Sequence, residues 1–273
     1  MSNINPRRDT LRPINTIDPL AAGPVKALCN TLETFFRERI LSILLHGSIV
    51  NDDFAIGYSD IDFLVVFNDT ISDDDCGQLR EMRKRFKAGD CGQLGYALEG
   101  AFLPRSMLDP SVLGSAFWWG TSGERRGDKN PLDHFTLQGI RDNGCLIFGC
   151  DILSEIPVPT EPDLLKEVDD FIVSARQHAA AGRVKSVDWL LTASRLLKWV
   201  TQNEMSSKSA AADWAMIHAQ GPWRDSLRQA KSIRLDTASA ENPNAKAWLA
   251  TLRTPILEAI DELESALRQR KKQ

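Results

Sequence analysis

The feature that most constrains the fold of this chain is a proline-rich stretch near its middle. Pro157, Pro159 and Pro162 place three prolines within six residues, which excludes a continuous helix or a central strand at that point. The apolar residues before this stretch and those after it follow different periods. We therefore expect two domains, residues 1–157 and residues 158–273, with the prolines at the junction.

The first segment has the pattern of an α+β domain, with short apolar runs broken by Gly, Asn and Asp. The predicted strands are residues 43–45, 61–67, 95–103 and 145–148, and the predicted helices are residues 25–40, 81–87 and 131–140. In the second segment the spacing is helical, as at Leu164, Val168 and Phe171. We predict a mixed sheet with flanking helices, followed by an all-α helical bundle.

The amino-acid composition limits the classes of partner that this chain can be expected to bind. The chain has 273 residues, and 33 Lys and Arg against 37 Asp and Glu give a net charge of -4, so nothing attracts it generally to phosphate backbones. No apolar run approaches the roughly 20 residues that span a bilayer. Arg7 and Arg8 have no apolar core behind them, as a secretory signal would. We expect a cytoplasmic protein with no nucleic-acid and no membrane partner, and the oligomeric state stays open.

Cysteine, histidine and C-terminal basic residues give little functional signal. The five cysteines include no Cys-x-x-Cys pair and the four histidines are scattered, which predicts reduced thiols and no zinc site. The basic run at residues 268–273 is interpreted as the solvated end of a helix.

Asp60 and Asp62 stand on either side of Ile61, at the start of an apolar run. Because strand side chains alternate and rise about 3.3 Å per residue, the two carboxylates are expected on one face, about 7 Å apart. Such a pair can bind a hard divalent cation, whose charge offsets the cost of acids beside a buried strand. The alternative is that Ser59 and Asp60 form a turn and Asp62 is solvated.

Gly47 and Ser48 end an earlier apolar run. Glycine lets the backbone approach a ligand closely, and a serine hydroxyl with nearby N–H groups can hold a phosphate. The dipeptide alone is common, but its combination with the Asp-x-Asp pair that follows is specific.

Gly47-Ser48 and Ser59-Asp60-Ile61-Asp62 together resemble the active-site signature of the DNA polymerase β-like nucleotidyltransferase superfamily. A second match lies in the helical segment. There Leu-Thr-Ala-Ser-Arg at residues 191–195 and Ser-Lys-Ser-Ala-Ala-Ala-Asp-Trp-Ala at residues 207–215 resemble elements of the aminoglycoside adenylyltransferases that modify streptomycin and spectinomycin. The two resemblances cover most of the chain from about residue 40 to residue 220.

The resemblance implies a nucleotidyltransferase domain followed by a helical domain, with ATP as co-substrate and Mg²⁺ as cofactor. Asp60 and Asp62 would hold the metal, and Glu99 would be the general base or a further metal ligand. The implied nucleotide contacts are Gly47, Ser48, Ser59, Asp133, Arg195 and Lys208.

Each of the more distant residues also has an ordinary structural interpretation. Glu99 could face water on an edge strand, and Asp133 could be the N-cap of a helix. Arg195 could be a surface cation, and Lys208 could lie beside a Ser206-Ser207 cap.

The chain departs from the streptomycin-modifying enzymes in the segment before the Arg element. Those enzymes place acidic and aromatic residues there to hold the cationic drug, whereas residues 179–185 of this chain are small or basic. Arg183 and Lys185 would repel a cationic drug if they line its pocket. Asp188 and Trp189 follow one to two turns later and could substitute.

We predict a Mg-dependent nucleotidyltransferase that transfers AMP from ATP to a hydroxyl of a small molecule, with an aminoglycoside as a candidate acceptor and antibiotic resistance as the consequence. Two alternatives stay open. One is a protein-modifying, antitoxin-like nucleotidyltransferase, and the other is a catalytically silent nucleotide-binding regulator.

Overall fold

A computed structural model describes residues 10–13, 17–121 and 123–272. Its contacts divide the chain into two compact units. Unit 1 comprises Met1–Phe54 and Ser59–Pro159, and unit 2 comprises Ala55–Tyr58 and Thr160–Gln273. From the sequence we expected the domain boundary two residues earlier. We did not expect that a short loop of the N-terminal half would belong to the helical unit.

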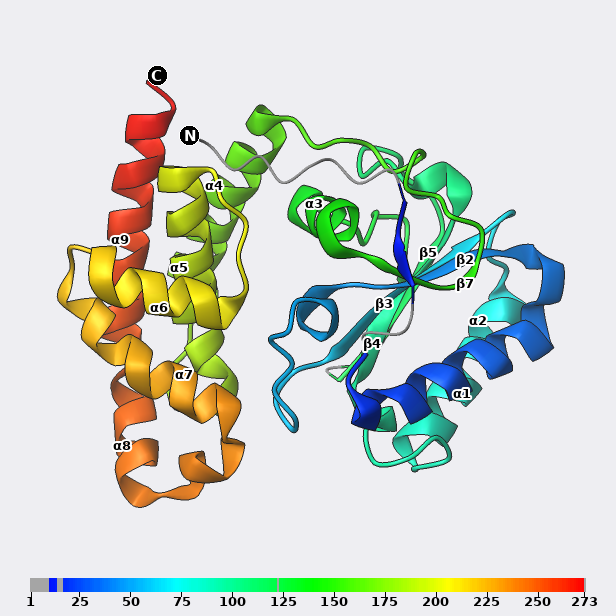
Figure 1. Cartoon of the computed structure of the whole chain (residues 1–273), viewed down its shortest axis with the longest axis horizontal. Helices are drawn as coiled ribbons and strands as arrows, with labels where there is room; N and C mark the ends of the chain where they lie inside the picture. Colours follow the sequence, from blue (N-terminus) through cyan, green and yellow to red (C-terminus); the bar gives the residue numbers. More distant parts are fainter. Residues whose placement is uncertain (1–9, 14–16, 122, 273) are drawn as a thin grey trace. The chain divides into compact units, whose positions relative to one another are not determined.

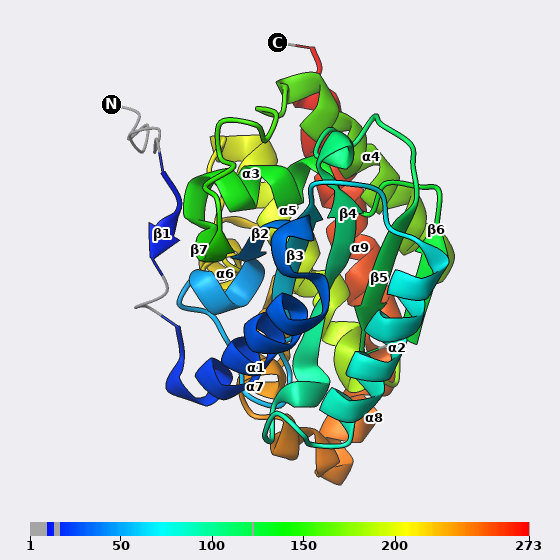
Figure 2. The ribbon, with the colours of Figure 1, turned by 90° about the vertical axis from the view of Figure 1, so that its right-hand side faces the viewer.

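Unit 1 is built on a seven-stranded sheet of order β1-β7-β2-β3-β4-β5-β6. The strands are β1 (Arg12–Pro13), β2 (Ile40–Leu45), β3 (Ile61–Phe67), β4 (Leu98–Pro104), β5 (Ala116–Gly120), β6 (Gly123–Gly127) and β7 (Cys145–Gly149). Figure 2 shows β1 at one edge and β6 at the other. The pairs β3–β4 and β1–β7 are parallel and the others are antiparallel, so the predicted mixed sheet is confirmed.

Helices cover both faces of this sheet. Helices α1 (Pro19–Phe36) and α2 (Asp73–Lys87) lie on one face, and α3 (His134–Asn143) lies on the other (Figure 1). The odd-numbered residues of β3 pack toward α1 and α2, and its even-numbered residues Leu64 and Val66 pack with Leu137 and Ile140 of α3. Because strand side chains alternate, each face of the sheet therefore packs into its own hydrophobic core.

Several predicted boundaries shift. The helix expected at residues 25–40 ends at Phe36, because Arg37 has a φ of 46° that cannot continue a helix, and Ile40 already belongs to β2. The strand expected at residues 95–103 begins at Leu98, after a 3-10 turn. The hairpin of β5 and β6 was not predicted at all, because its second strand, Gly-Glu-Arg-Arg-Gly, has no apolar residue.

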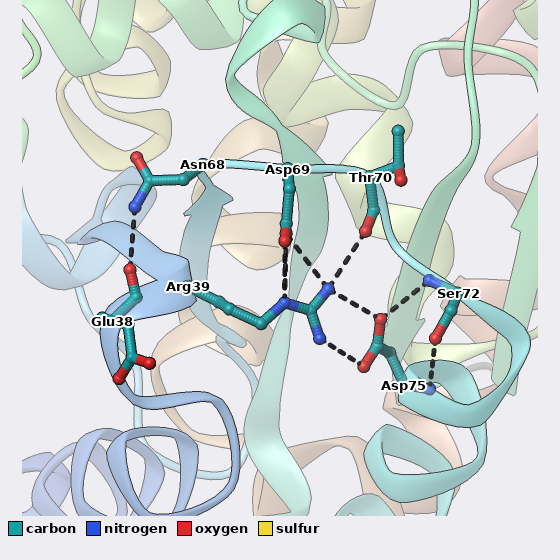
Figure 3. A network of polar contacts seen from close by, with 7 residues as sticks. All are labelled: Glu38, Arg39, Asn68, Asp69, Thr70, Ser72 and Asp75. Atoms are coloured by element: carbon teal, nitrogen blue, oxygen red, sulfur yellow. Dashed lines mark hydrogen bonds and ion pairs between the residues drawn. The ribbon is translucent and has the colours of Figure 1, made fainter.

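A polar network connects the start of β2 to the start of α2 (Figure 3). Ser72 and Asp75 form a capping box in which each side chain accepts a hydrogen bond from the other residue's N–H. Arg39 donates to both carboxylate oxygens of Asp75, at 2.7 and 2.9 Å, and to Asp69. These bonds hold the pKa of Asp75 down at about 2.

Unit 2 is helical, which confirms the predicted second domain type. Its helices are α4 (Glu161–His178), α5 (Val187–Gln202), α6 (Lys208–His218), α7 (Leu227–Leu235), α8 (Pro243–Thr251) and α9 (Arg253–Arg270). Thr160 caps α4 by accepting from the N–H of Asp163. Helix α5 packs against α6, α7 and α9, and ten of its 16 residues are buried (Figure 1).

The sequence suggested that the basic run near the C-terminus is simply solvated. The contacts of Arg270 show that this is wrong for that residue. Arg270 donates to the carbonyl oxygens of Trp199 and Val200, to Asn203 Oδ1 and to Glu161 Oε1. Its guanidinium also lies 4.3 Å from the centre of the Trp199 ring. The last turn of α9 therefore adds hydrogen bonds to two carbonyl groups in the last turn of α5.

The five cysteines all lie within the described residues, and none of them is joined in a disulfide. Among the helices that the structure describes, none is both long and apolar enough to cross a membrane.

Candidate active site

Asp62 and Glu99 occupy opposite positions on neighbouring strands. Strands β3 and β4 are parallel, and their register pairs Asp62 with Glu99. Residues two and four positions further along each strand pack toward α3, so both carboxylates lie on the α3 face of the sheet. Because paired strands are about 4.8 Å apart, the register places the two acids side by side.

The turn after β2 fits closely against Asp62. Gly47 begins the 3-10 helix η3 (Gly47–Val50) with a φ of 71°, and a Cβ atom built on it would lie 2.1 Å from Asp62 Oδ2. The N–H of His46 donates to the carbonyl oxygen of Asp62 at 3.0 Å. Glycine is therefore needed at residue 47 both for the backbone angle and for the space that the carboxylate takes.

The same turn is held by Asn51. Its side-chain amide donates to the carbonyl oxygen of Gly47 at 2.7 Å, and its N–H donates to that of Ser48 at 3.2 Å. Ser48 lies in η3, directly after β2, and Ser59 and Asp60 directly precede β3. The structure thus places these predicted residues at the N-terminal side of β3, but Asp60 stands just before the strand and not within it.

Glu99 is fixed by the hairpin that the sequence did not predict. Glu99 Oε2 accepts the N–H of Thr121 at 3.1 Å. A Cβ atom on Gly120 would lie 2.1 Å from the same oxygen, so only glycine fits beside this carboxylate. The carbonyl oxygen of Gly120 accepts in turn from Arg83 at 2.8 Å. The edge-strand alternative for Glu99 is wrong, because β4 lies between β3 and β5.

Asp133 is the N-cap of α3, as one of its two interpretations predicted. Its Oδ1 accepts the N–H of Thr136 at 2.6 Å. Helix α3 also contacts η3, the turn after β2. Burial lowers the pKa of His46 to about 4, against the opposing effect of Asp133, so this imidazole is neutral at pH 7. A nucleotide contact for Asp133 remains a prediction.

Arg195 and Lys208 lie at one place in unit 2. Arg195, in α5, donates from Nε to the carbonyl oxygen of Ser206 at 3.0 Å, two residues before Lys208. Lys208 is the first residue of α6, after the N-cap Ser207, and its ammonium donates to Asp188 Oδ1 at 2.5 Å. The second unit therefore brings together the two cations that the resemblance singled out.

The residues considered for a cationic acceptor have other partners. Asp188 is paired with Lys208, and the ring of Trp189 lies 5.7 Å from that of Phe171. Lys185, which was expected to repel a cationic drug, donates to the carbonyl oxygen of Tyr58. The sequence did not predict this hydrogen bond from Lys185 to Tyr58, because the two residues are 127 positions apart.

The described part of the chain holds no ready-made cluster of metal ligands. Within residues 10–13, 17–121 and 123–272, no three His, Cys, Asp or Glu side chains are grouped so that they could hold a metal ion by themselves. The site offers instead a carboxylate pair, Asp62 and Glu99, with Asp60 nearby in sequence. Mg²⁺ is usually bound by one or two carboxylates together with substrate phosphates and water, so these acids fit such an ion.

Two family models and a solved structure match this chain. Residues 28–106 match the family model of a nucleotidyltransferase domain, and residues 153–259 match that of the aminoglycoside adenylyltransferase C-terminal domain. Among solved structures, a spectinomycin adenyltransferase from Enterococcus faecialis, crystallised with ATP and spectinomycin, has a similar fold. The match has a TM-score of 0.65 and 16% sequence identity, and it covers 90% of this chain and 98% of that one. No match was found among curated proteins.

Proposed function

Because this chain is a nucleotidyltransferase of the aminoglycoside adenylyltransferase type, we propose that it transfers AMP from ATP to a hydroxyl group of a small molecule. The observation that carries the proposal is the pairing of Asp62 with Glu99 across β3 and β4, beside the Gly47 turn. Two carboxylates and a closely approaching backbone turn therefore lie together at the N-terminal ends of β3 and β4.

In the proposed reaction, the acceptor hydroxyl attacks the α-phosphorus of ATP and pyrophosphate leaves. Glu99 takes the proton of that hydroxyl, as a general base within hydrogen-bond reach would. The N–H of Thr121 keeps the Glu99 carboxylate in one orientation, and Gly120 leaves room for it. Orientation of this kind matters because a reacting pair must be aligned before the proton moves.

Asp60 and Asp62 are the residues proposed to hold Mg²⁺, and the alternative role of Glu99 is that of a further ligand. When bound, the cation supplies positive charge that offsets the charge of the triphosphate and of the leaving pyrophosphate. The turn at Gly47 and Ser48, together with Ser59, is proposed to bind phosphate oxygens through N–H and hydroxyl groups.

Arg195 and Lys208 are proposed to bind the phosphates as well, and Asp133 to contact the nucleotide. Lys208 would then exchange the Asp188 carboxylate for a phosphate oxygen. Both are charge-assisted hydrogen bonds, so the Lys208 ammonium keeps a partner of opposite charge after the exchange.

The acceptor is proposed to be an aminoglycoside or a related aminocyclitol, by analogy with the spectinomycin enzyme of similar fold. Asp188 and Trp189 have partners of their own, so they give no independent support for a streptomycin-like cation. Spectinomycin and streptomycin should therefore be compared directly.

The test is pyrophosphate release by the full chain with ATP and Mg²⁺, in the presence of spectinomycin, streptomycin, other aminoglycosides or no acceptor. The proposal expects release that depends on one of these acceptors and a product heavier by one AMP. The Asp62→Asn variant serves as the inactive control. Release without any small-molecule acceptor, with AMP attached to protein, would favour the protein-modifying alternative. Binding of Mg-ATP without transfer to any acceptor would favour the silent regulator.

A further inference from the structure

The loop Ala55–Tyr58 belongs to the helical unit, although it lies in the chain between η3 and β3 of unit 1. Tyr58 is only 4% exposed. The next two residues are Ser59 and Asp60, and β3 begins at Ile61. The segment that leads into the proposed metal-binding acids is therefore held by residues of unit 2.

One ammonium group holds both the main chain and the ring of Tyr58. Lys185 Nζ donates to the Tyr58 carbonyl oxygen at 2.6 Å, and it lies 4.5 Å from the centre of the Tyr58 ring. A charge-assisted hydrogen bond and a cation–π contact each stabilise such an arrangement. Lys185 therefore fixes the position of the backbone as well as that of the side chain.

A second cation connects Tyr58 to α6. The guanidinium of Arg234, in α7, lies 6.0 Å from the centre of the Tyr58 ring, and Arg234 is only 2% exposed. Its Nη1 donates to Ser209 Oγ at 3.2 Å, and Ser209 directly follows Lys208. Tyr58, Lys185, Arg234 and Ser209, which we call the Tyr58 cluster, thus join the loop before Asp60 to the helix that begins with Lys208.

The loop itself is short and closely folded. The N–H of Tyr58 donates to the carbonyl oxygen of Ala55 at 3.0 Å, and Gly57 has a φ of 78°. A Cβ atom on Gly57 would lie 3.5 Å from Thr237 Oγ1, which is an ordinary contact distance. Two residues of extended chain span at most about 7 Å, so the position of Tyr58 limits that of Asp60.

We propose that Lys185 and Tyr58 are positioning residues for Asp60, which hold the segment 59–62 in the geometry that the bound metal requires. This inference rests on the proposed function, because it assumes that Asp60 binds Mg²⁺ with ATP. It adds a role for Lys185 that differs from lining an acceptor pocket. Neither residue touches the reacting atoms, and both act through the backbone.

The test compares four variants of the full chain with the wild type. Lys185→Met removes the ammonium, and Tyr58→Leu removes the aromatic ring. Lys185→Arg keeps a cation that can reach both contacts, and Arg228→Met removes an exposed positive charge from α7 as the matched control. The first measurement is backbone amide hydrogen exchange at residues 59–62 without nucleotide, which needs no enzymatic activity. The second is the Mg²⁺ concentration for half-maximal binding of ATP, followed by calorimetry.

We expect exchange at residues 59–62 to rise about tenfold or more in Lys185→Met and in Tyr58→Leu, since each variant loses the cation–π contact and Lys185→Met also loses the charged hydrogen bond. The half-saturating Mg²⁺ concentration should rise in the same two variants and stay at the wild-type value in Lys185→Arg and Arg228→Met. Unchanged exchange in Lys185→Met would overturn the proposal. So would raised exchange with an unchanged Mg²⁺ requirement, because the loop would then not position Asp60.

Failure of the proposed function gives a different result. A wild-type chain that binds no Mg-ATP would contradict the proposed function and the role of Asp60 in it. The exchange measurement would still report whether Lys185 holds the loop. A fall in the melting temperature of Lys185→Met, with wild-type exchange at residues 59–62 below that temperature, would mean a structural role only and would also overturn the positioning role.

Discussion

Asp62 takes the space that any side chain on Gly47 would need, since a Cβ atom at residue 47 would lie 2.1 Å from Asp62 Oδ2. The hydrogen bond from the His46 N–H to the Asp62 carbonyl oxygen joins the same two segments. The turn after β2 and the start of β3 are therefore fitted to each other at the carboxylate. The Gly-Ser dipeptide and the Asp-x-Asp pair act as one structural unit.

The first prediction follows from this contact. Gly47→Ala should displace the Asp62 carboxylate or the turn, and should also strain a backbone with φ of 71°. A displacement of about 1 Å in an active site costs about a hundredfold in rate, so turnover should fall by about that factor. The control is Gly77→Ala in α2, where a Cβ atom meets nothing within 4 Å. Wild-type turnover in Gly47→Ala would contradict the close fit.

The second prediction concerns the proposed metal ligands. Asp62→Asn or Asp60→Asn removes a negative ligand and should lower turnover about a thousandfold, or about 4 kcal/mol of transition-state stabilisation. Circular dichroism and the melting temperature should stay close to those of the wild type. Asp74→Asn, an exposed acid in the first turn of α2, is the matched control. Near-normal turnover in either site variant would remove the central claim of the proposed function.

The third prediction distinguishes a general base from a metal ligand at residue 99. Glu99→Gln keeps an oxygen that can accept the N–H of Thr121, but it cannot take a proton from the acceptor. If Glu99 is the base, calorimetry should show wild-type Mg-ATP affinity while the rate of pyrophosphate release is mostly lost. If Glu99 is mainly a metal ligand, affinity should fall with the rate. An unchanged rate would exclude both roles.

The fourth prediction concerns the second unit. Lys208→Ala should weaken ATP binding about tenfold, which is about 1.4 kcal/mol, because the phosphates lose one cation. Lys231 forms a similar ion pair with Asp213 at 2.6 Å, so Lys231→Ala is a well-matched control that should bind ATP normally. Equal losses in the two variants would point to a general charge effect and not to a phosphate contact.

The fifth prediction is the pH dependence of stability at Asp75. Its folded-state pKa is lowered from 3.8 to about 2, chiefly by the hydrogen bonds from Arg39 (Figure 3). The stabilisation, about 2 kcal/mol, is present above the unfolded-state pKa and is lost as the pH falls from about 4 to about 2. Urea unfolding of the wild type should therefore show a steeper loss of stability in this range than unfolding of Asp75→Asn. Parallel pH profiles for the two proteins would disprove the assignment.

Local signals in the sequence were enough for the fold class and the family. Three prolines, a change of period from strands to helices, and the two separated motifs depend only on neighbouring residues, and both expectations are confirmed. The helix caps are local in the same way, since Asp133 accepts from a backbone N–H three residues away. What the sequence described less well were the ends of elements, such as the helix that stops at Phe36 because of the backbone angle of Arg37.

The contacts that give the site its form depend on the tertiary structure. The side-by-side placement of Asp62 and Glu99 comes from the register of two parallel strands, which no local pattern specifies. The hairpin that holds Glu99 through Thr121 contains a strand without apolar residues, so hydrophobic alternation does not reveal it. The bond between Lys185 and Tyr58 joins residues 127 positions apart. The sequence by itself therefore determined which chemical groups the chain has and which local elements carry them. Only the folded chain decided which groups meet, because strand pairing and side-chain packing act between residues that are far apart in the sequence.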